Sequence, residues 1–445
     1  MAQSPLSAGP REPLLGRALQ VRRGELVGLI AAAAYFFCLL CSYYILRPVR
    51  DEMGVRGGVE NMQWLFTATF FAMLVAVPIF AALAARFRRT RLIPAVYGLF
   101  LVCIGLFWWW LRADVQMVWA ARSFFVWLSV FNLFVVSVFW SFLADLFEDE
   151  PATRLFGAIA AGGSAGAIVG PAISGLLAQQ LEPTALLPVA GGILALTLPC
   201  MAVLEWWSLR RRDGGQAGAS ASGQALGGAL FEGVQAVLRS RYLQGICLFI
   251  WLYTTLATFL YFVQAEIVSE TFGDSGDRTS VFATIDFLTN SLTVGIQLFL
   301  TARIVRYFGL ARALAFVPLL VAAGFLILAA APVLLAIAGV QIVRRAGNYA
   351  LAKPGREMLF TVVPRFEKYK SKNFIDTVVY RGGDAIAGWV YTLLGALGLG
   401  IAGISLTAIP LALLWAGIGY RLGRARQARA IGRADANEPV GMAAG

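Results

Sequence analysis

The sequence contains no histidine among its 445 residues, and only 14% of its residues are charged. Without an imidazole, metal sites, general bases and proton relays that depend on histidine are excluded. Soluble domains average about 25% charged residues, so the low share argues against a soluble protein. The net charge is +12, but the arginines cluster in short segments between apolar runs. That pattern is typical of the loops of membrane proteins, and we expect no nucleic-acid partner.

Sequence motifs of common enzymes are lacking as well. The chain has no Walker lysine motif, no glycine-rich dinucleotide fingerprint and no nucleophile elbow. Its five cysteines lie in apolar runs, and Cys38 and Cys41 form a C-x-x-C inside the first of these runs. We interpret both as small buried hydrophobic residues. We therefore expect no enzyme activity, no cofactor and no metal site.

Apolar residues are abundant, at 59% of the chain. They form runs of about 20 residues, the length that crosses a bilayer as a helix. A helix satisfies its own backbone hydrogen bonds in lipid. We predict an all-α polytopic membrane protein with twelve transmembrane helices. The predicted spans are 25–46, 62–84, 92–112, 117–143, 155–178, 185–208, 241–266, 279–302, 310–330, 332–352, 374–399 and 401–421.

Positive charge is concentrated in the loops after the second, sixth, eighth and tenth spans and in the C-terminal tail, whereas the alternate loops carry almost none. Loops rich in lysine and arginine face the cytoplasm. We therefore predict a multi-pass protein of the inner membrane of a bacterium, with both termini in the cytoplasm. Arg47 and Arg50, at the outer end of the first predicted span, are exceptions to this charge rule and need another explanation.

The chain also repeats itself weakly. ARFRRTRLIP at 85 resembles ARIVRYFGLA at 302, and TRLFGAIAAGGSAG at 153 resembles NFIDTVVYRGGDAIAG at 373, so both offsets lie near 220 residues. Two related six-helix halves are the plan of major-facilitator transporters. The predicted parts are a cytoplasmic tail over 1–24, a half over 25–208, a linker over 209–240, a half over 241–421 and a tail over 422–445.

Several charged residues fall inside or at the ends of predicted spans. A charge in the bilayer is costly, so it normally faces a cavity or a partner. Arg381 and Asp384 are three residues apart and share a helix face, where they could bind a ligand or only stabilise the helix. Arg122 could snorkel to the surface, and Asp145 could pair at the cytoplasmic face. The other such residues are Arg47, Arg50, Asp286, Arg344 and Arg345.

Three stretches resemble the ATP/ADP translocase family of nucleotide exchangers. They are YYILRPVRDEMG (43–54), NYALAKPGREMLFTVV (348–363) and EKYKSKNFIDTVVYRGGD (367–384). The resemblance implies a major-facilitator-like exchanger in which basic residues hold phosphates. The positions that match the family's charged residues are Arg47, Arg50, Asp51, Arg356, Glu357, Asp376 and Arg381.

The chain departs from the family pattern at three places. Asp384 stands where the family has a lysine, and Asn348 stands at the leading lysine of its K-Y-A-L. The family's glutamate in the fourth span has no clear equivalent, and Ser129 and Asn132 lie in that neighbourhood. An aspartate in place of the family's lysine at position 384 changes the local charge by two units. That change could alter which substrate group this subsite prefers.

From these residues we predict a secondary active transporter that works by alternating access and exchanges a small anionic solute such as ATP or ADP. We expect Arg47 and Arg50 to end the first helix at a central cavity, with the helix end loosened by Pro48, which has no N–H. The protein is expected to work as a monomer in the bilayer. Predicted substrate-binding residues are Arg47, Arg50, Asp51, Asp286, Arg344, Arg345, Arg356, Arg381 and Asp384. Predicted gating or structural residues are Asn132, Asp145, Glu357 and Asp376.

Two alternatives remain open at this point. A proton-coupled major-facilitator transporter of another solute would use Asp286 or Asp384 as the proton carrier. A non-transporting membrane scaffold or sensor would not need the buried arginines for its function, and no substrate would stabilise it.

Overall fold

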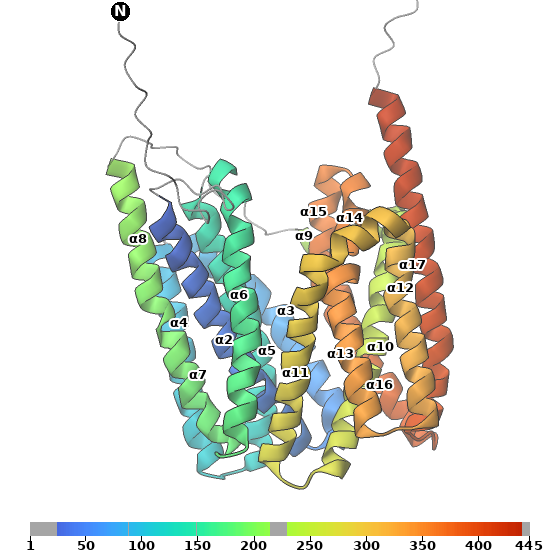
Figure 1. The fold of residues 1–445 in the computed structure, drawn as a ribbon, viewed down its shortest axis with the longest axis horizontal. Helices are drawn as coiled ribbons and strands as arrows, with labels where there is room; N and C mark the ends of the chain where they lie inside the picture. Colours follow the sequence, from blue (N-terminus) through green and yellow to red (C-terminus); the bar gives the residue numbers. More distant parts are fainter. Residues whose placement is uncertain (1–24, 88, 148, 214–228, 438–445) are drawn as a thin grey trace, which may run out of the picture.

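The computed structural model describes residues 25–87, 89–147, 149–213 and 229–437. These residues form helices arranged in two bundles, one from each half of the chain (Figure 1). The N-terminal bundle consists of α2 (Leu26–Arg56), α3 (Met62–Arg86), α4 (Arg89–Arg112), α5 (Met117–Leu146), α6 (Asp149–Ala178) and the consecutive helices α7 (Leu186–Ala195) and α8 (Thr197–Asp213). The short 3₁₀ helices η1 (Val59–Asn61) and η2 (Pro183–Ala185) lie in its loops.

The C-terminal bundle begins with α10 (Arg241–Thr271), α11 (Ser275–Phe299), α12 (Thr301–Ala330) and α13 (Leu334–Gly347). It continues with the π-helix η3 (Asn348–Ala352), α14 (Lys353–Leu359), the 3₁₀ helix η4 (Phe360–Val362), α15 (Arg365–Phe374), the π-helix η5 (Ile375–Val379), α16 (Tyr380–Ala396) and α17 (Ile401–Asn437). A short helix, α9 (Ala229–Arg239), precedes this bundle and packs on α15. The beginning of α2 and the end of α17 lie on one side of the molecule, called the terminal side below (Figure 1).

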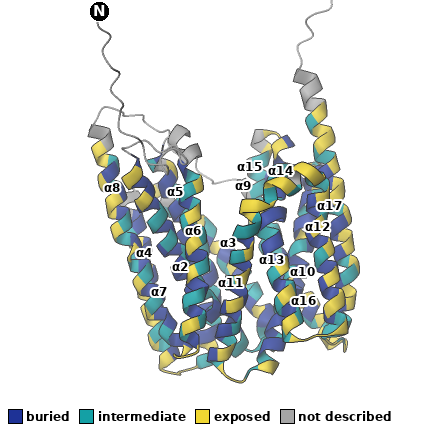
Figure 2. Ribbon diagram, in the orientation of Figure 1, coloured by how far each residue is buried: buried dark blue, intermediate teal, exposed yellow. Residues whose placement is uncertain are grey.

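Each bundle has its own apolar core. One buried cluster runs from Leu29 to Trp207, and a second comprises Met62 and residues from Val237 to Leu422. Exposed residues occur along the helices of both bundles (Figure 2). Large apolar side chains are among them, such as Trp109 at 67% and Leu335 at 84%. Apolar patches of this extent do not face water on soluble proteins, whereas they match lipid. The all-helical, two-bundle membrane fold predicted from the sequence is confirmed.

The predicted spans recur as helices, but several boundaries were wrong. Ten helical segments are long and apolar enough to cross a membrane within the described residues. The predicted spans 332–352 and 374–399 contain instead α13 followed by η3, and η5 followed by α16. π-helical turns interrupt α-helices mostly at functional sites. Residues of the predicted linker and C-terminal tail also extend helices, since α8 reaches Asp213, α9 begins at Ala229 and α17 reaches Asn437.

The predicted end of the first helix was wrong, because α2 does not end at Leu46 but continues through Pro48 to Arg56. Pro48 removes one helical hydrogen bond, so the predicted loosening of the helix end was reasonable. The segment after it stays helical because Val49 and Met53 are fully buried in the core. Arg47 and Arg50 therefore lie within a helix, about two turns before its end.

Close packing holds α2 in place. Along α6, four glycines face α2, and a Cβ atom added at Gly170 would lie 2.7 Å from the backbone oxygen of Cys41. Gly166 meets the backbone oxygen of Phe37 in the same way. Small residues at this spacing let two membrane helices approach closely. The part of α2 just before Arg47 is thus packed closely against α6.

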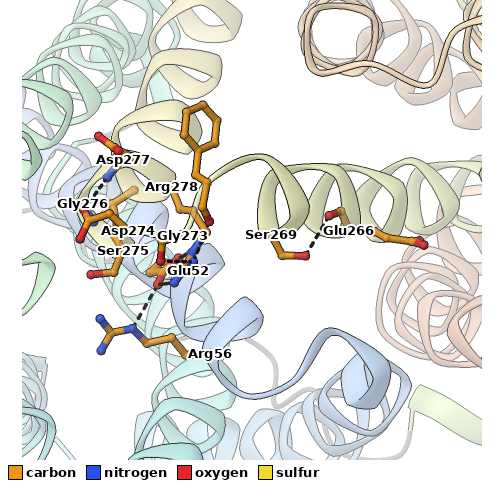
Figure 3. Close-up of polar contacts among 12 residues, drawn as sticks. Glu52, Arg56, Glu266, Ser269, Gly273, Asp274, Ser275, Gly276, Asp277 and Arg278 are labelled. Carbon is orange, nitrogen blue, oxygen red and sulfur yellow. Dashed lines mark hydrogen bonds and ion pairs between the residues drawn. The ribbon is translucent and has the colours of Figure 1, made fainter.

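The two bundles meet on the side opposite the terminal side. There Glu52 of α2 is fully buried and accepts two hydrogen bonds of 2.7 Å from Arg278 of α11 (Figure 3). Arg56 donates to the same carboxylate at 3.1 Å. Arg278 also donates to the backbone oxygens of Phe272 and Gly273. The Nε and Nη2 groups of Arg278 donate to Glu52, while its Nη1 group donates to the loop. Arg278 therefore connects α2 to the loop between α10 and α11.

That loop is itself ordered by a helix cap. The carboxylate of Asp274 accepts hydrogen bonds from the backbone N–H groups of Gly276 and Asp277, at 2.7 and 3.1 Å. These two hydrogen bonds hold the pKa of Asp274 below its ordinary value, and the one from Asp277 has the larger effect. Farther along the same interface, Asn290 of α11 donates to the backbone oxygen of Ala167 in α6 at 2.6 Å. On the other flank, Trp389 of α16 donates to Thr67 of α3 at 3.1 Å.

We predict that Glu52→Gln lowers the apparent melting temperature of the purified protein by several degrees. The substitution leaves Arg278 without its carboxylate partner, and loss of one member of a buried ion pair costs about 3–5 kcal/mol. Differential scanning fluorimetry in detergent measures the change. Glu60→Gln, at an exposed carboxylate, is the matched control, and equal melting temperatures for the two variants would contradict the assignment. The double variant Glu52→Gln/Arg278→Gln should lower the melting temperature by less than the sum of the decreases in the two single variants.

Candidate functional site

The predicted site residues gather around two adjoining cavities between the bundles. The inner cavity has a volume of about 170 Å³. It is lined from the N-terminal bundle by α2, α3 and α5, and from the C-terminal bundle by α10, α13, η3 and α16. Five arginines line it: Arg47, Arg50, Arg344, Arg345 and Arg381. Only two carboxylates line it, those of Asp51 and Asp384.

A third carboxylate, that of Asp286, lies behind the inner cavity and is fully buried. One of its oxygens is 2.6 Å from Nη2 of Arg345 and 3.5 Å from Nη1 of Arg47. Asp286 belongs to α11 and Arg47 to α2, so this ion pair joins the two bundles. Neither carboxylate oxygen has a hydrogen bond of good geometry among the described residues. One negative charge therefore compensates two guanidinium groups that face the cavity.

Arg50 contacts one residue of its own helix and one residue of α5. Its guanidinium group lies 2.7 Å from the carboxylate of Asp51 and 4.8 Å from the ring centre of Phe125 on α5. The hydroxyl of Tyr261 on α10 donates to the same oxygen of Asp51 at 2.8 Å. Asp51 thus neutralises Arg50, and it makes a second connection between the bundles.

Arg344 is the buried arginine with no carboxylate partner among the described residues. Only 7% of it is exposed. It donates to the side-chain oxygen of Gln341 at 2.7 and 3.2 Å. Gln341 in turn donates to the backbone oxygen of Leu260, which holds it in position. An unpaired guanidinium group in a membrane cavity favours an anion as its missing partner.

Arg381 and Asp384 share one face of α16, as predicted. Their closest atoms are 3.6 Å apart, and Thr258 of α10 donates to Asp384 at 3.3 Å. Arg381 lies 5.6 Å from the ring centre of Tyr380. Asp384 therefore compensates the charge of Arg381 on its own helix and pairs with no other arginine of the inner cavity among the described residues.

The outer cavity lies between the inner cavity and the terminal side and has a volume of about 500 Å³. Its rim carries the matched pairs Arg356 with Asp376, at 3.2 Å, and Lys372 with Glu357, at 2.6 Å. Arg356 is also 3.7 Å from Glu357. The predicted residues Arg356, Glu357 and Asp376 are thus brought together, but around this outer cavity and not beside Arg47 and Arg50.

Asn132 of α5 also lines the outer cavity, and it makes no side-chain hydrogen bond among the described residues. Arg122, by contrast, donates to the backbone oxygen of Gly57 at the end of α2 at 2.8 Å and stacks on Trp119. Its role there is structural. The side chain of Asp145 lies outside the described residues.

Sequence reasoning missed the tyrosines and the glutamine of the site. Tyr253, Tyr349 and Tyr380 line both cavities, and Tyr261 and Gln341 hold charged groups in place. Tyrosine within an apolar run is compatible with core packing or an interface position, so the sequence carried no distinguishing signal for these residues.

Comparison with known proteins places this geometry in a family. The sequence profile of the Major Facilitator Superfamily matches residues 26–351. No curated protein sequence gives a match. A bacterial homologue of the iron transporter ferroportin, in an inward-facing state, has a TM-score of 0.65 at 12% identity, over 93% of this chain and 100% of that chain.

Two further solved structures have a similar fold. The nucleoside transporter NupG has a TM-score of 0.61 at 13% identity, over 92% of this chain and 99% of that chain. A bacterial homologue of the human lysosomal transporter Spinster, inward-facing and unoccupied, has a TM-score of 0.56 at 13% identity, over 92% and 99% of the two chains. The profile covers more than half of the sequence, and the two-bundle fold agrees with it, so the chain belongs to the Major Facilitator Superfamily.

Proposed function

We propose that the protein exchanges a small anionic solute across the membrane by alternating access, and that this solute is a nucleotide of the ATP or ADP type. The observation that carries the proposal is the surplus of positive charge at the inner cavity, where five arginines meet only the carboxylates of Asp51, Asp384 and Asp286 among the described residues. Guanidinium groups bind phosphate oxygens in pairs. The sequence resemblance to ATP/ADP translocases supports the nucleotide.

The proposed transport cycle follows from the contacts between the bundles. The cavities extend toward the terminal side, while Glu52, Arg278 and Asp286 join the bundles on or toward the other side. Rocking of one half against the other would break these pairs and open the site to that side. We propose that the terminal side faces the cytoplasm of a bacterium, because the basic loops lie there, and that one chain is the working unit.

Exchange is favoured over one-way transport by the surplus of positive charge. An empty site would have to rearrange with at least one uncompensated guanidinium group in a medium of low dielectric constant, which is costly. A bound anion removes that cost. Return of the carrier therefore requires a second anion.

Arg344→Gln is predicted to weaken binding of ADP about 10- to 100-fold, because a hydrogen bond to a charged group contributes about 1.5–3 kcal/mol. Arg344 has no carboxylate partner, so its removal strands no buried charge, unlike removal of Arg47 or Arg345. Isothermal titration calorimetry on the purified protein measures the affinity. Arg210→Gln, an exposed site on α8, is the control and should bind as the wild type. Unchanged affinity in Arg344→Gln would argue against an anion at the inner cavity.

Uptake of labelled ADP into proteoliposomes is predicted to require unlabelled nucleotide inside. Vesicles without internal nucleotide should take up no more label than protein-free vesicles, since the empty site does not return. Equal uptake with and without internal nucleotide would contradict exchange.

Proton coupling is the second possibility, and Asp384 is the observation that favours it, because its carboxylate is part of the inner cavity wall and is only loosely paired with Arg381. A proton gradient imposed on empty vesicles distinguishes the two. Under the exchange proposal it drives no uptake. Uptake driven by the gradient and lost in Asp384→Asn would establish the alternative.

A further inference from the structure

The inner and outer cavities are parts of one elongated site. They share four lining residues, Tyr253, Tyr349, Tyr380 and Arg381. The inner part, at about 170 Å³, is smaller than the pockets that hold whole ligands, which measure about 300–1,000 Å³. The outer part, at about 500 Å³, falls within that range. A solute whose anionic group fills the inner part must place the rest of its body in the outer part.

The two walls of the outer cavity differ in chemistry. On the C-terminal bundle, the half-buried rings of Tyr253 and Tyr380 line the cavity with their centroids 6.0 Å apart. The buried rings of Trp415 and Phe249 continue this series behind Tyr253, with successive centroids 5.7 and 5.5 Å apart. Facing them, the N-terminal bundle contributes the aliphatic side chains of Met73, Val77 and Leu133. A wall of rings opposite a wall of aliphatic groups suits a flat unsaturated group better than a hydrated sugar.

One polar group interrupts the aliphatic wall. Asn132 offers both a donor and an acceptor from its amide, and no described residue uses either. Among the charged groups that line the outer cavity, Arg356 pairs with Asp376 and Lys372 pairs with Glu357. Asn132 is a neutral group with a free donor and a free acceptor, which is what the edge of a heteroaromatic ring requires.

We infer that the outer cavity is a ring-binding subsite, in which the aromatic wall and Val77 enclose an aromatic or heteroaromatic group and Asn132 reads its edge. This inference rests on the proposed function, because it takes the anionic group of the same solute to lie on the inner arginines. It adds the place at which the ring of that nucleotide binds, and it assigns the selection among rings to Asn132.

The test compares affinities of purified protein in detergent for five probes: inorganic phosphate, ribose 5-phosphate, AMP, UMP and phenyl phosphate. At least one ring-bearing probe should bind about tenfold more tightly than ribose 5-phosphate, the gain typical of stacking on aromatic side chains. Asn132→Leu should reduce the ratio of AMP or UMP affinity to ribose 5-phosphate affinity and leave ribose 5-phosphate unchanged.

Arg344→Gln is the matched comparison, since it should weaken all phosphate probes in parallel and keep the ratio. Val77→Phe, which fills the slot, should abolish the ring preference even if Asn132→Leu does not fold. Equal affinity of all ring probes and ribose 5-phosphate overturns the inference, as does a parallel loss in Asn132→Leu. Absence of binding by every phosphate probe, inorganic phosphate included, overturns the proposed anion site instead.

Discussion

Asp286 carries one negative charge between two guanidinium groups in the interior of a membrane protein, and the arrangement of the bundles depends on that contact. A buried charge is tolerated in the bilayer only with a partner. Asp286 on α11 and Arg345 on α13 both belong to the C-terminal bundle, whereas Arg47 belongs to α2. Arg47 therefore reaches Asp286 only when the two bundles are closed on the side of Glu52 and Arg278. Closure of the bundles on that side and compensation of the charge of Arg47 therefore occur together.

The rigidity of α2 makes this coupling effective. Glycines of α6 let the two backbones touch along Phe37 and Cys41, and buried side chains hold the helix on both sides of Pro48. Arg47, Arg50 and Glu52 consequently move as one body with the N-terminal bundle. Any motion that separates α2 from α11 must break the pairs of Arg47 and Glu52 together, which is the behaviour expected of a two-state interface.

The sequence predicts the parts of this structure that follow from local composition. Helices appear where apolar runs reach the thickness of a bilayer, and the two halves follow from the repeat. The end of α2 was missed because burial of Val49 and Met53 is a tertiary effect. The π-helices η3 and η5 have no recognisable sequence signature. Arg356 follows η3, Asp376 lies within η5, and both line the outer cavity. The pairing of Asp286 with Arg345 joins residues on different helices, which no spacing rule can reach.

Asp384 illustrates how such pairing changes the meaning of a sequence difference. The exchange of a lysine for an aspartate subtracts two charges from a site and, read alone, suggests repulsion of an anion. In the structure Asp384 faces Arg381 of its own helix and Thr258, so the loss is confined to the α16 end of the inner cavity. The uncompensated charge is left with Arg344, beside Arg345 and Arg47. This uneven distribution of positive charge sets the orientation of the proposed substrate. Its anionic group lies toward α13 and α2, and the remainder extends past the tyrosines toward Asn132.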